Sequence, residues 1–264
     1  MARSKEQVRV RLAIFDIDGT IFRSSLIIEL FNELVRRGVF PERAGREVEH
    51  DYLNWLNRKG HYNDYIMRVV RVFYREIAGC SVRRVAPAVR AVVAWQKDRV
   101  HRYPRFLIND LKRRGYFILV ISNSPEPMVK QFARAMGFHD AIGYALEVVD
   151  GVYTGRSILG GRKVPGTSWM DKVDELRRYI GLNTMDVDLR NSVMIGDSEG
   201  DLPLLSFVGR PIAFNPSLPL ARIARRRGWR IIVERKDAVY DIRDARFIPV
   251  PGRKPRVPYG NKKR

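Results

Sequence analysis

The chain has little cysteine, few acidic residues and no long apolar run, and each scarcity excludes a class of protein. Cys80 is the single cysteine among 264 residues, so no intrachain disulfide can form and a reducing, cytoplasmic location is expected. We expect Cys80 to be a small buried residue rather than a reactive thiol. No run approaches the ~18 apolar residues that a spanning helix needs, which predicts no membrane span. The charged first residues resemble neither a signal peptide nor a membrane anchor.

Acidic residues are scarce relative to basic ones. Lysine and arginine number 49 against 29 aspartates and glutamates, which gives a formal net charge of +20. Between positions 221 and 264 there are 15 basic and 4 acidic residues. A basic chain attracts phosphorylated metabolites, nucleic acid or an anionic membrane surface. Solvated charged faces explain the excess more simply, and nucleic acid stays an alternative partner of lower rank.

The stretch from 10 to 22, VRLAIFDIDGTIF, organises the chain around it. Its apolar, β-branched and aromatic residues predict a buried strand that ends at Asp16, Asp18 and Gly19. Ligand sites of open α/β sheets gather at the carboxyl ends of strands, where these two carboxylates fall. Two acids this close repel each other, so the pair requires a cation, a proton or a chemical role.

Residues 23–111 carry helical patterns and few strand signals. The stretch 26–34 has apolar residues at the i, i+3, i+4, i+7 spacing of a helix, and similar stretches follow. A crossover between parallel strands needs only about a dozen residues. The sequence therefore predicts an inserted helical cap over 23–111. We expect its aromatic residues, Tyr52, Trp55 and Tyr62 among them, to form the cap's own core rather than a base-stacking platform.

Two further apolar stretches predict strands that end in polar residues. YFILVI at 116–121 is followed by Ser122, Asn123 and Ser124, and Ser124 before a proline predicts a helix N-cap. SVMI at 192–195 is followed by GDSEGD, which contains Asp197 and Asp201. The carboxyl ends of parallel strands meet at one edge of a sheet, so these residues are expected to converge with the first aspartates.

Strands that alternate with helices predict a doubly wound, mainly parallel α/β sheet. We assign the core to 8–22 and 112–235, and a partly disordered basic tail to 236–264. A β-hairpin is predicted around Asp150-Gly151, followed by a glycine-rich loop over 155–166. A helix over 168–180 would carry Lys172 near its start.

FDIDGT at 15–20, SNS at 122–124, Lys172 and GDSEGD at 196–201 resemble, in order, the four motifs of the haloacid dehalogenase superfamily. The helical insertion and the hairpin make the chain similar to its phosphoserine-phosphatase-like branch, which has a helical cap. This resemblance spans about residues 10 to 233. It implies a magnesium-dependent phosphomonoester hydrolase that acts through an aspartyl phosphate on a small phosphorylated metabolite.

The resemblance also implies roles for single residues. Asp16 would be the nucleophile, and Asp18 the acid for the leaving group and then the base for water. Ser122 and the Asn123 amide would bind the transferred phosphoryl group. Lys172 would offset the charge on Asp16 and on the phosphoryl oxygens.

A second set of roles concerns the metal. Asp16, Asp197 and the backbone carbonyl of Asp18 would bind Mg²⁺. Asp201 would hold a metal-bound water or orient the lysine. Thr20 would support the nucleophile loop.

Departures from the family pattern leave the identity of the phosphate ester open. SNS replaces the usual SGG, and the family's glutamate after the first motif is missing, with Glu29 a turn further on. Arg23, Arg68 and Arg75 would suit an anionic leaving group, and Lys163 competes with Lys172 for its role. A nucleic-acid-associated phosphatase or binding protein that uses the basic C-terminal region stays an alternative, as does a catalytically silent module. No oligomeric state is predicted.

Overall fold

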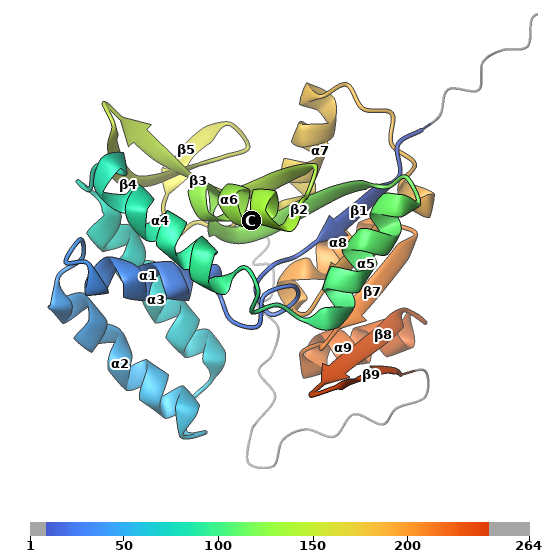
Figure 1. The fold of residues 1–264 in the computed structure, drawn as a ribbon, viewed down its shortest axis with the longest axis horizontal. Coiled ribbons are helices and arrows are strands. Elements are labelled where there is room, and N and C mark those ends of the chain that lie inside the picture. The colour runs from blue at the N-terminus through green and yellow to red at the C-terminus, as the bar shows by residue number, and fades with distance from the viewer. Residues whose placement is uncertain (1–8, 243–264) are drawn as a thin grey trace, which may run out of the picture.

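A nine-stranded sheet runs through residues 9–242, the part of the chain that the computed structural model describes (Figure 1). Its strand order is β5-β4-β3-β2-β1-β6-β7-β8-β9. The strands are β1 (Leu12–Phe15), β2 (Phe117–Pro125), β3 (Asp140–Val149), β4 (Val152–Leu159), β5 (Arg162–Pro165), β6 (Val193–Gly196), β7 (Arg210–Phe214), β8 (Arg230–Arg235) and β9 (Ala238–Asp241). The predicted basic tail thus includes strand β9, and its remainder, 243–264, lies outside the described residues.

Strand β1 lies inside the sheet because all four of its residues are apolar and completely buried. It pairs in parallel with β2 on one side and β6 on the other, and β3, β7 and β8 continue the parallel order. A strand covered on both faces has a continuous apolar sequence, which LAIF is. Strands β4, β5 and β9 are antiparallel additions at the two edges. The predicted mainly parallel α/β sheet is confirmed.

Four helices between β1 and β2 form a layer beside the sheet (Figure 1). The helices of the chain are α1 (Leu26–Arg36), α2 (Glu42–Leu56), α3 (Tyr62–Ile77), α4 (Val82–Gln96), α5 (Arg102–Arg113), α6 (Glu126–Met136), α7 (Lys172–Leu182), α8 (Leu202–Phe207) and α9 (Leu218–Arg226). Helices α1 to α4 pack on one another, whereas α5 packs against β2 of the sheet. No helix among residues 9–242 is long and apolar enough to cross a membrane.

The cap layer has an aromatic core of its own. Phe31, Phe40 and Phe73 are fully buried, and successive ring centroids lie 5.9 and 5.7 Å apart. The prediction was wrong for Tyr52 and Tyr62, which are 38% and 37% exposed. These two rings belong to a group at the edge of the cap and are not part of its core.

The glycine-rich stretch over 155–166 is not the predicted loop. It continues β4, turns at Gly160 and Gly161, which both have positive φ, and returns as β5. A Cβ on Gly155 would lie 2.9 Å from the Ala78 side chain, so glycine lets this hairpin approach the end of α3 closely. The hairpin predicted around Asp150 is confirmed, with β3 and β4 antiparallel on either side of it.

Candidate active site

The predicted site residues lie together at the carboxyl ends of the central strands. Asp16 directly follows β1, Asp197 directly follows β6, and Ser122 lies within β2, the other neighbour of β1. The sheet register places Phe15 beside both Val120 and Ile195. Parallel strands therefore deliver their polar residues to one edge, as the sequence predicted.

Lys172 forms the central contact of the site. Its ammonium group donates to Asp16 Oδ1 and to Asp201 Oδ1, both at 2.7 Å, and all three side chains are buried. Helix α7 begins at Lys172 because Asp171 caps it and accepts hydrogen bonds from Val173 and Asp174. Burial alone would lower the pKa of Lys172, but Asp16 and Asp201 raise it above its ordinary value.

The competing lysine lies elsewhere. Lys163 is in β5, where its ammonium pairs with Glu147 at 2.6 Å and its side chain is 62% exposed. The structure therefore brings Lys172, and not Lys163, to Asp16.

Asp18 has a different set of partners. Its Oδ1 accepts a 2.6 Å hydrogen bond from the Leu26 backbone N–H at the start of α1. Its Oδ2 accepts from the hydroxyls of Ser122 at 3.1 Å and Ser124 at 2.7 Å. Burial raises the pKa of Asp18, and these three donors oppose the shift. The net effect favours the protonated form of Asp18 relative to an ordinary aspartate, as a general acid requires.

The contact of Ser124 with Asp18 corrects its predicted role. Strand β2 continues to Pro125, α6 begins at Glu126 with Pro125 as N-cap, and Ser124 therefore does not cap the helix. Its backbone N–H donates to Ser122 Oγ at 3.0 Å, so the two serines that contact Asp18 also contact each other. The SNS motif was itself the signal, but Ser124 before a proline was interpreted as a cap.

Asp201 organises the loop that carries Asp197. Its Oδ2 accepts from the backbone N–H groups of Asp197 at 3.1 Å and Ser198 at 3.2 Å, and from the Ser198 hydroxyl at 3.2 Å. Its Oδ1 is bound to Lys172. Asp201 was predicted to hold a metal-bound water or to orient the lysine. The structure shows its contact with the lysine. Gly19 permits the close approach of Asp197, because a Cβ there would lie 2.3 Å from Asp197 Oδ2.

The site holds more buried negative charge than positive charge. Asp16, Asp18, Asp197 and Asp201 gather around Lys172, the only ammonium that forms ion pairs with them in the described part of the chain. Burial raises the pKa of Asp16 to about 7, and repulsion from Asp201 adds to the shift. Burial, followed by repulsion from Asp201 and Asp16, raises the pKa of Asp197 well above its ordinary value.

This excess of charge fits a divalent cation. Oxygens of Asp16, Asp197 and Asp201 lie within 4.8 Å of one another. Carboxylate oxygens are the ligands that Mg²⁺ prefers, and a cation among them would offset the repulsion. The carboxylate of Asp18 is not part of this group, and its predicted contribution was a backbone carbonyl.

Two predicted site residues have unpaired polar atoms. Thr20 is fully buried, and its hydroxyl has no hydrogen-bond partner among the described residues. The side-chain oxygen of Asn123 is likewise buried without a described partner. Their predicted functions, support of the loop and binding of the phosphoryl group, stay predictions.

The cap brings residues to the site that the sequence did not indicate. The Tyr62 hydroxyl interacts with Ser25, and burial, followed by the charges of Asp18 and Asp197, raises the pKa of Tyr62. The Tyr62 hydroxyl therefore lies near Asp18 and Asp197. Its ring packs on Trp55, with centroids 5.4 Å apart. No spacing in the sequence distinguishes this tyrosine from the cap's other aromatic residues.

A carboxylate lies beside these rings. Glu29 of α1 is half-buried, accepts a 2.8 Å hydrogen bond from Gln96 Nε2, and raises the pKa of Tyr65 together with burial and Tyr52. Gln96 is 7% exposed, and its own carbonyl oxygen is buried without a described partner.

Comparisons with known proteins agree with the motifs. A family model described as haloacid dehalogenase-like hydrolase matches residues 13–206. Phosphoserine phosphatase SerB1 of Mycobacterium tuberculosis is 28% identical over 230 residues, which cover 83% of this chain and 69% of that protein. A histidinol-phosphatase of Neisseria meningitidis is 25% identical over 234 residues, which cover 84% and 97%.

Two solved structures share the fold. A protein of unknown function from Bordetella pertussis Tohama I superposes with a TM-score of 0.63 at 24% identity, covering 85% of this chain and 98% of that one. A phospho-aspartyl intermediate analogue of phosphoserine phosphatase gives 0.55 at 21% identity, with coverage of 87% and 96%.

Proposed function

The chain belongs to the haloacid dehalogenase-like hydrolases, and from that premise we propose that it is a magnesium-dependent phosphatase of small phosphomonoesters. Asp16 would form the aspartyl phosphate. This proposal rests on the different surroundings of Asp16 and Asp18 at the end of β1. Lys172 holds one oxygen of Asp16, whereas Asp18 is buried among hydroxyls and holds a proton more readily than an ordinary aspartate.

The metal would bind to Asp16, Asp197 and the Asp18 backbone carbonyl, with Asp201 close by. When bound, Mg²⁺ supplies positive charge that neutralises phosphoryl oxygens and keeps Asp16 ionised. The carboxylate excess described above supports this assignment, because one ammonium cannot balance the buried Asp16 and Asp201 together with the half-buried Asp18 and Asp197.

The residues divide the reaction between them. Asp16 Oδ2, which accepts no hydrogen bond from a described residue, attacks phosphorus, and the bond from phosphorus to the ester oxygen breaks. Protonated Asp18 gives its proton to the departing alkoxide. Ionised Asp18 then takes a proton from water, which attacks phosphorus and breaks its bond to Asp16. Phosphate leaves, and both carboxyl groups regain their starting states.

The charges in the cap favour a substrate whose leaving alcohol is cationic. Its arginines had suggested an anionic leaving group. Arg68 pairs with Asp51, and Arg75 pairs with Glu47, so both charges are already offset within the cap. Glu29 forms no ion pair with a lysine or arginine in the described chain.

The surroundings of Glu29 would complement an amine. The unpartnered Gln96 oxygen could accept from an ammonium, and the rings of Tyr62 and Tyr65 offer π faces to a cation. The names of two relatives agree with this, since serine and histidinol are both amino alcohols. We therefore propose the phosphate ester of an amino alcohol as the substrate.

The phosphatase reaction is tested with p-nitrophenyl phosphate. Wild type should turn over with Mg²⁺, lose activity in EDTA and regain it when Mg²⁺ is restored. Asp16→Asn should lose at least about 10³-fold in kcat, because it removes the nucleophile. Turnover by Asp16→Asn equal to that of wild type would eliminate the mechanism.

The leaving group is tested with phosphoserine, phosphoethanolamine, phosphocholine and histidinol phosphate against glycerol phosphate and sugar phosphates. Glu29→Gln should raise KM about tenfold for the amino esters and leave KM for glycerol phosphate unchanged. Glu42→Gln is the matched control, because Glu42 is a cap glutamate with an 86% exposed side chain. Equal effects of Glu29→Gln on both substrate groups would refute the cationic assignment.

A further inference from the structure

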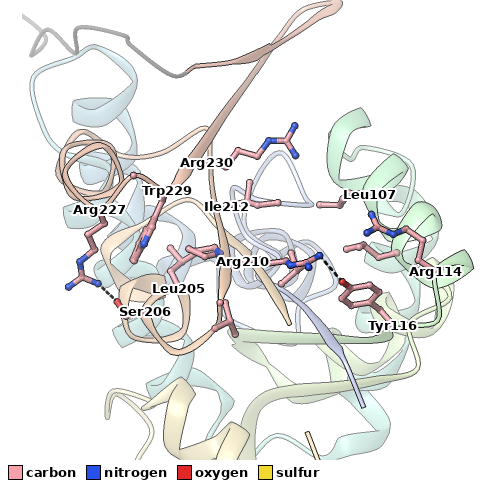
Figure 2. Close-up of a pocket in the computed structure, with 16 residues that line it drawn as sticks. Leu107, Arg114, Tyr116, Leu205, Ser206, Arg210, Ile212, Arg227, Trp229 and Arg230 are labelled. Carbon is pink, nitrogen blue, oxygen red and sulfur yellow. Dashed lines mark hydrogen bonds between the residues drawn. The ribbon is translucent and has the colours of Figure 1, made fainter. Parts of the chain in front are cut away.

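A hollow of about 620 Å³ lies at the edge of the sheet opposite Asp16 and Asp197. Figure 2 shows the residues that line it. Arg210 and Arg230 are the first residues of β7 and β8, and Tyr116 directly precedes β2, so the hollow is formed at the amino ends of the strands. Asp16 and Asp197 follow carboxyl ends. The volume is in the range of about 300–1,000 Å³ that small-molecule sites occupy.

The wall of the hollow is basic. Four of its 16 lining residues are arginines, and none is an aspartate or glutamate. Arg114 and Arg230 are partly neutralised, by Asp110 at 3.4 Å and Asp241 at 2.8 Å. The remaining two, Arg210 and Arg227, form no ion pair with a carboxylate within residues 9–242.

Neutral acceptors hold these two arginines in place. Arg210 donates to the Tyr116 hydroxyl at 3.3 Å and to Asn191 Oδ1 at 3.1 Å. Arg227 donates to the Ser206 hydroxyl, as the dashed line in Figure 2 shows. Both side chains are exposed, and no described carboxylate offsets their charge. Guanidinium groups bind phosphate oxygens through paired N–H donors, so these two are available to an anionic ligand.

Between the arginines the wall is apolar and aromatic. Leu107, Leu205 and Ile212 line it, and Trp229 is half-buried with the Arg227 guanidinium 5.1 Å from its ring centroid. Inorganic phosphate would leave this apolar surface uncovered. A ligand that fits both parts carries phosphates together with a planar or apolar body.

We propose that the hollow binds a nucleotide, with its phosphates on Arg210 and Arg227 and its base against Trp229 and the apolar wall. The arginines lie around one half-open hollow whose volume suits a small ligand. This arrangement favours a free nucleotide over the backbone of an extended nucleic acid.

The test is ADP binding to the full chain in EDTA, measured by calorimetry and by tryptophan fluorescence. Arg227→Gln should weaken ADP binding about 10- to 100-fold, since a hydrogen bond to a charged group contributes about 1.5–3 kcal/mol. Arg226→Gln is the matched control. It removes the same charge from the neighbouring position of α9, which is exposed and does not line the hollow. It should change the affinity less than about twofold. Adenosine and inorganic phosphate, each of which has half of the required chemistry, should both bind more weakly than ADP.

Several results would overturn the proposal. The first is the absence of saturable ADP binding. The second is equal weakening by Arg227→Gln and Arg226→Gln, which would mean attraction to net charge alone. The third is unchanged ADP binding in Arg227→Gln, since the nucleotide would then lie elsewhere. The fourth is a single-stranded RNA that binds more tightly than ADP, with a steep salt dependence, and is lost in Arg227→Gln. Melting temperatures of both variants establish that they fold, and no arm depends on phosphatase activity.

Discussion

Replacing Lys172 by methionine tests whether one buried ammonium holds the candidate active site together. Methionine keeps the length and apolar stem of the side chain but removes its charge. Asp16 and Asp201 then lose the donor that each now has at 2.7 Å. They remain buried beside Asp197, whose charge repels both.

The expected loss of stability is large. Breaking a buried ion pair by removing one partner costs about 3–5 kcal/mol, because the other charge is left uncompensated. For a chain of this size that loss lowers Tm by roughly 6–20 °C. Burial already raises the pKa of Asp16 to about 7, so protonation relieves part of the repulsion at lower pH. The loss should therefore be greater at pH 8 than at pH 6.

Urea unfolding in EDTA gives the stability without a metal ion to replace the ammonium. The double variant Lys172→Met/Asp201→Asn removes one of the uncompensated charges and should regain at least about 1 kcal/mol. Both variants should lose about 10²- to 10³-fold in kcat toward p-nitrophenyl phosphate with Mg²⁺. Lys163→Met is the control for activity, because the Lys163 ammonium pairs with Glu147 and does not contact Asp16, so kcat should be unchanged. A Lys172→Met variant as stable and as active as wild type would refute this account of the site.

Three other substitutions test neighbouring parts of the structure. Ser124→Ala removes a 2.7 Å donor to Asp18 and should lower kcat about tenfold in the p-nitrophenyl phosphate assay, whereas no change would return Ser124 to a structural role. Gly19→Ala should cost more than about 1 kcal/mol in urea unfolding and abolish turnover, because φ is +83° and the new Cβ would meet Asp197. Glu234→Gln should cost about 1–3 kcal/mol at pH 7, since Glu234 accepts from the N–H groups of Arg102 and Tyr103. Burial alone would raise the Glu234 pKa, but these donors lower it, so its contribution is present above about pH 4.3 and is lost as pH falls below. A difference between wild type and Glu234→Gln that persists at pH 3 contradicts that assignment.

The sequence predicted that the motif residues meet at one edge of the sheet because each motif is local and each strand is a short apolar run. LAIF, the run before SNS, and SVMI are buried strands, and their polar endings meet because parallel strands share a direction. The local sequence pattern alone did not identify Lys172 as a site residue, because most lysines on helices are solvated. Its position followed from the resemblance, and the structure adds the two carboxylates that hold it.

The errors have identifiable physical causes. Ser124 before proline is a strong helix-start signal, but a buried aspartate competes for its hydroxyl and the strand continues. The stretch 155–166 has glycines for close packing against α3 as well as for turns, so its composition resembled a loop. Contacts between distant segments determine both outcomes, and no local pattern contains them.

The two edges of the sheet have opposite excess charges, and the same physical rule applies to both. At the carboxyl ends, Asp16, Asp197 and Asp201 exceed the one ammonium available, and at the amino ends Arg210 and Arg227 have no described carboxylate. A fixed charge without a partner is costly, since water or a shifted pKa must compensate for it. Both arginines are exposed, so water reduces this cost, and their described partners Tyr116, Asn191 and Ser206 are neutral. Ligands of the opposite sign would offset the excess charge at each edge. On this reasoning we propose a cation at the edge that carries Asp16 and a phosphorylated ligand at the other.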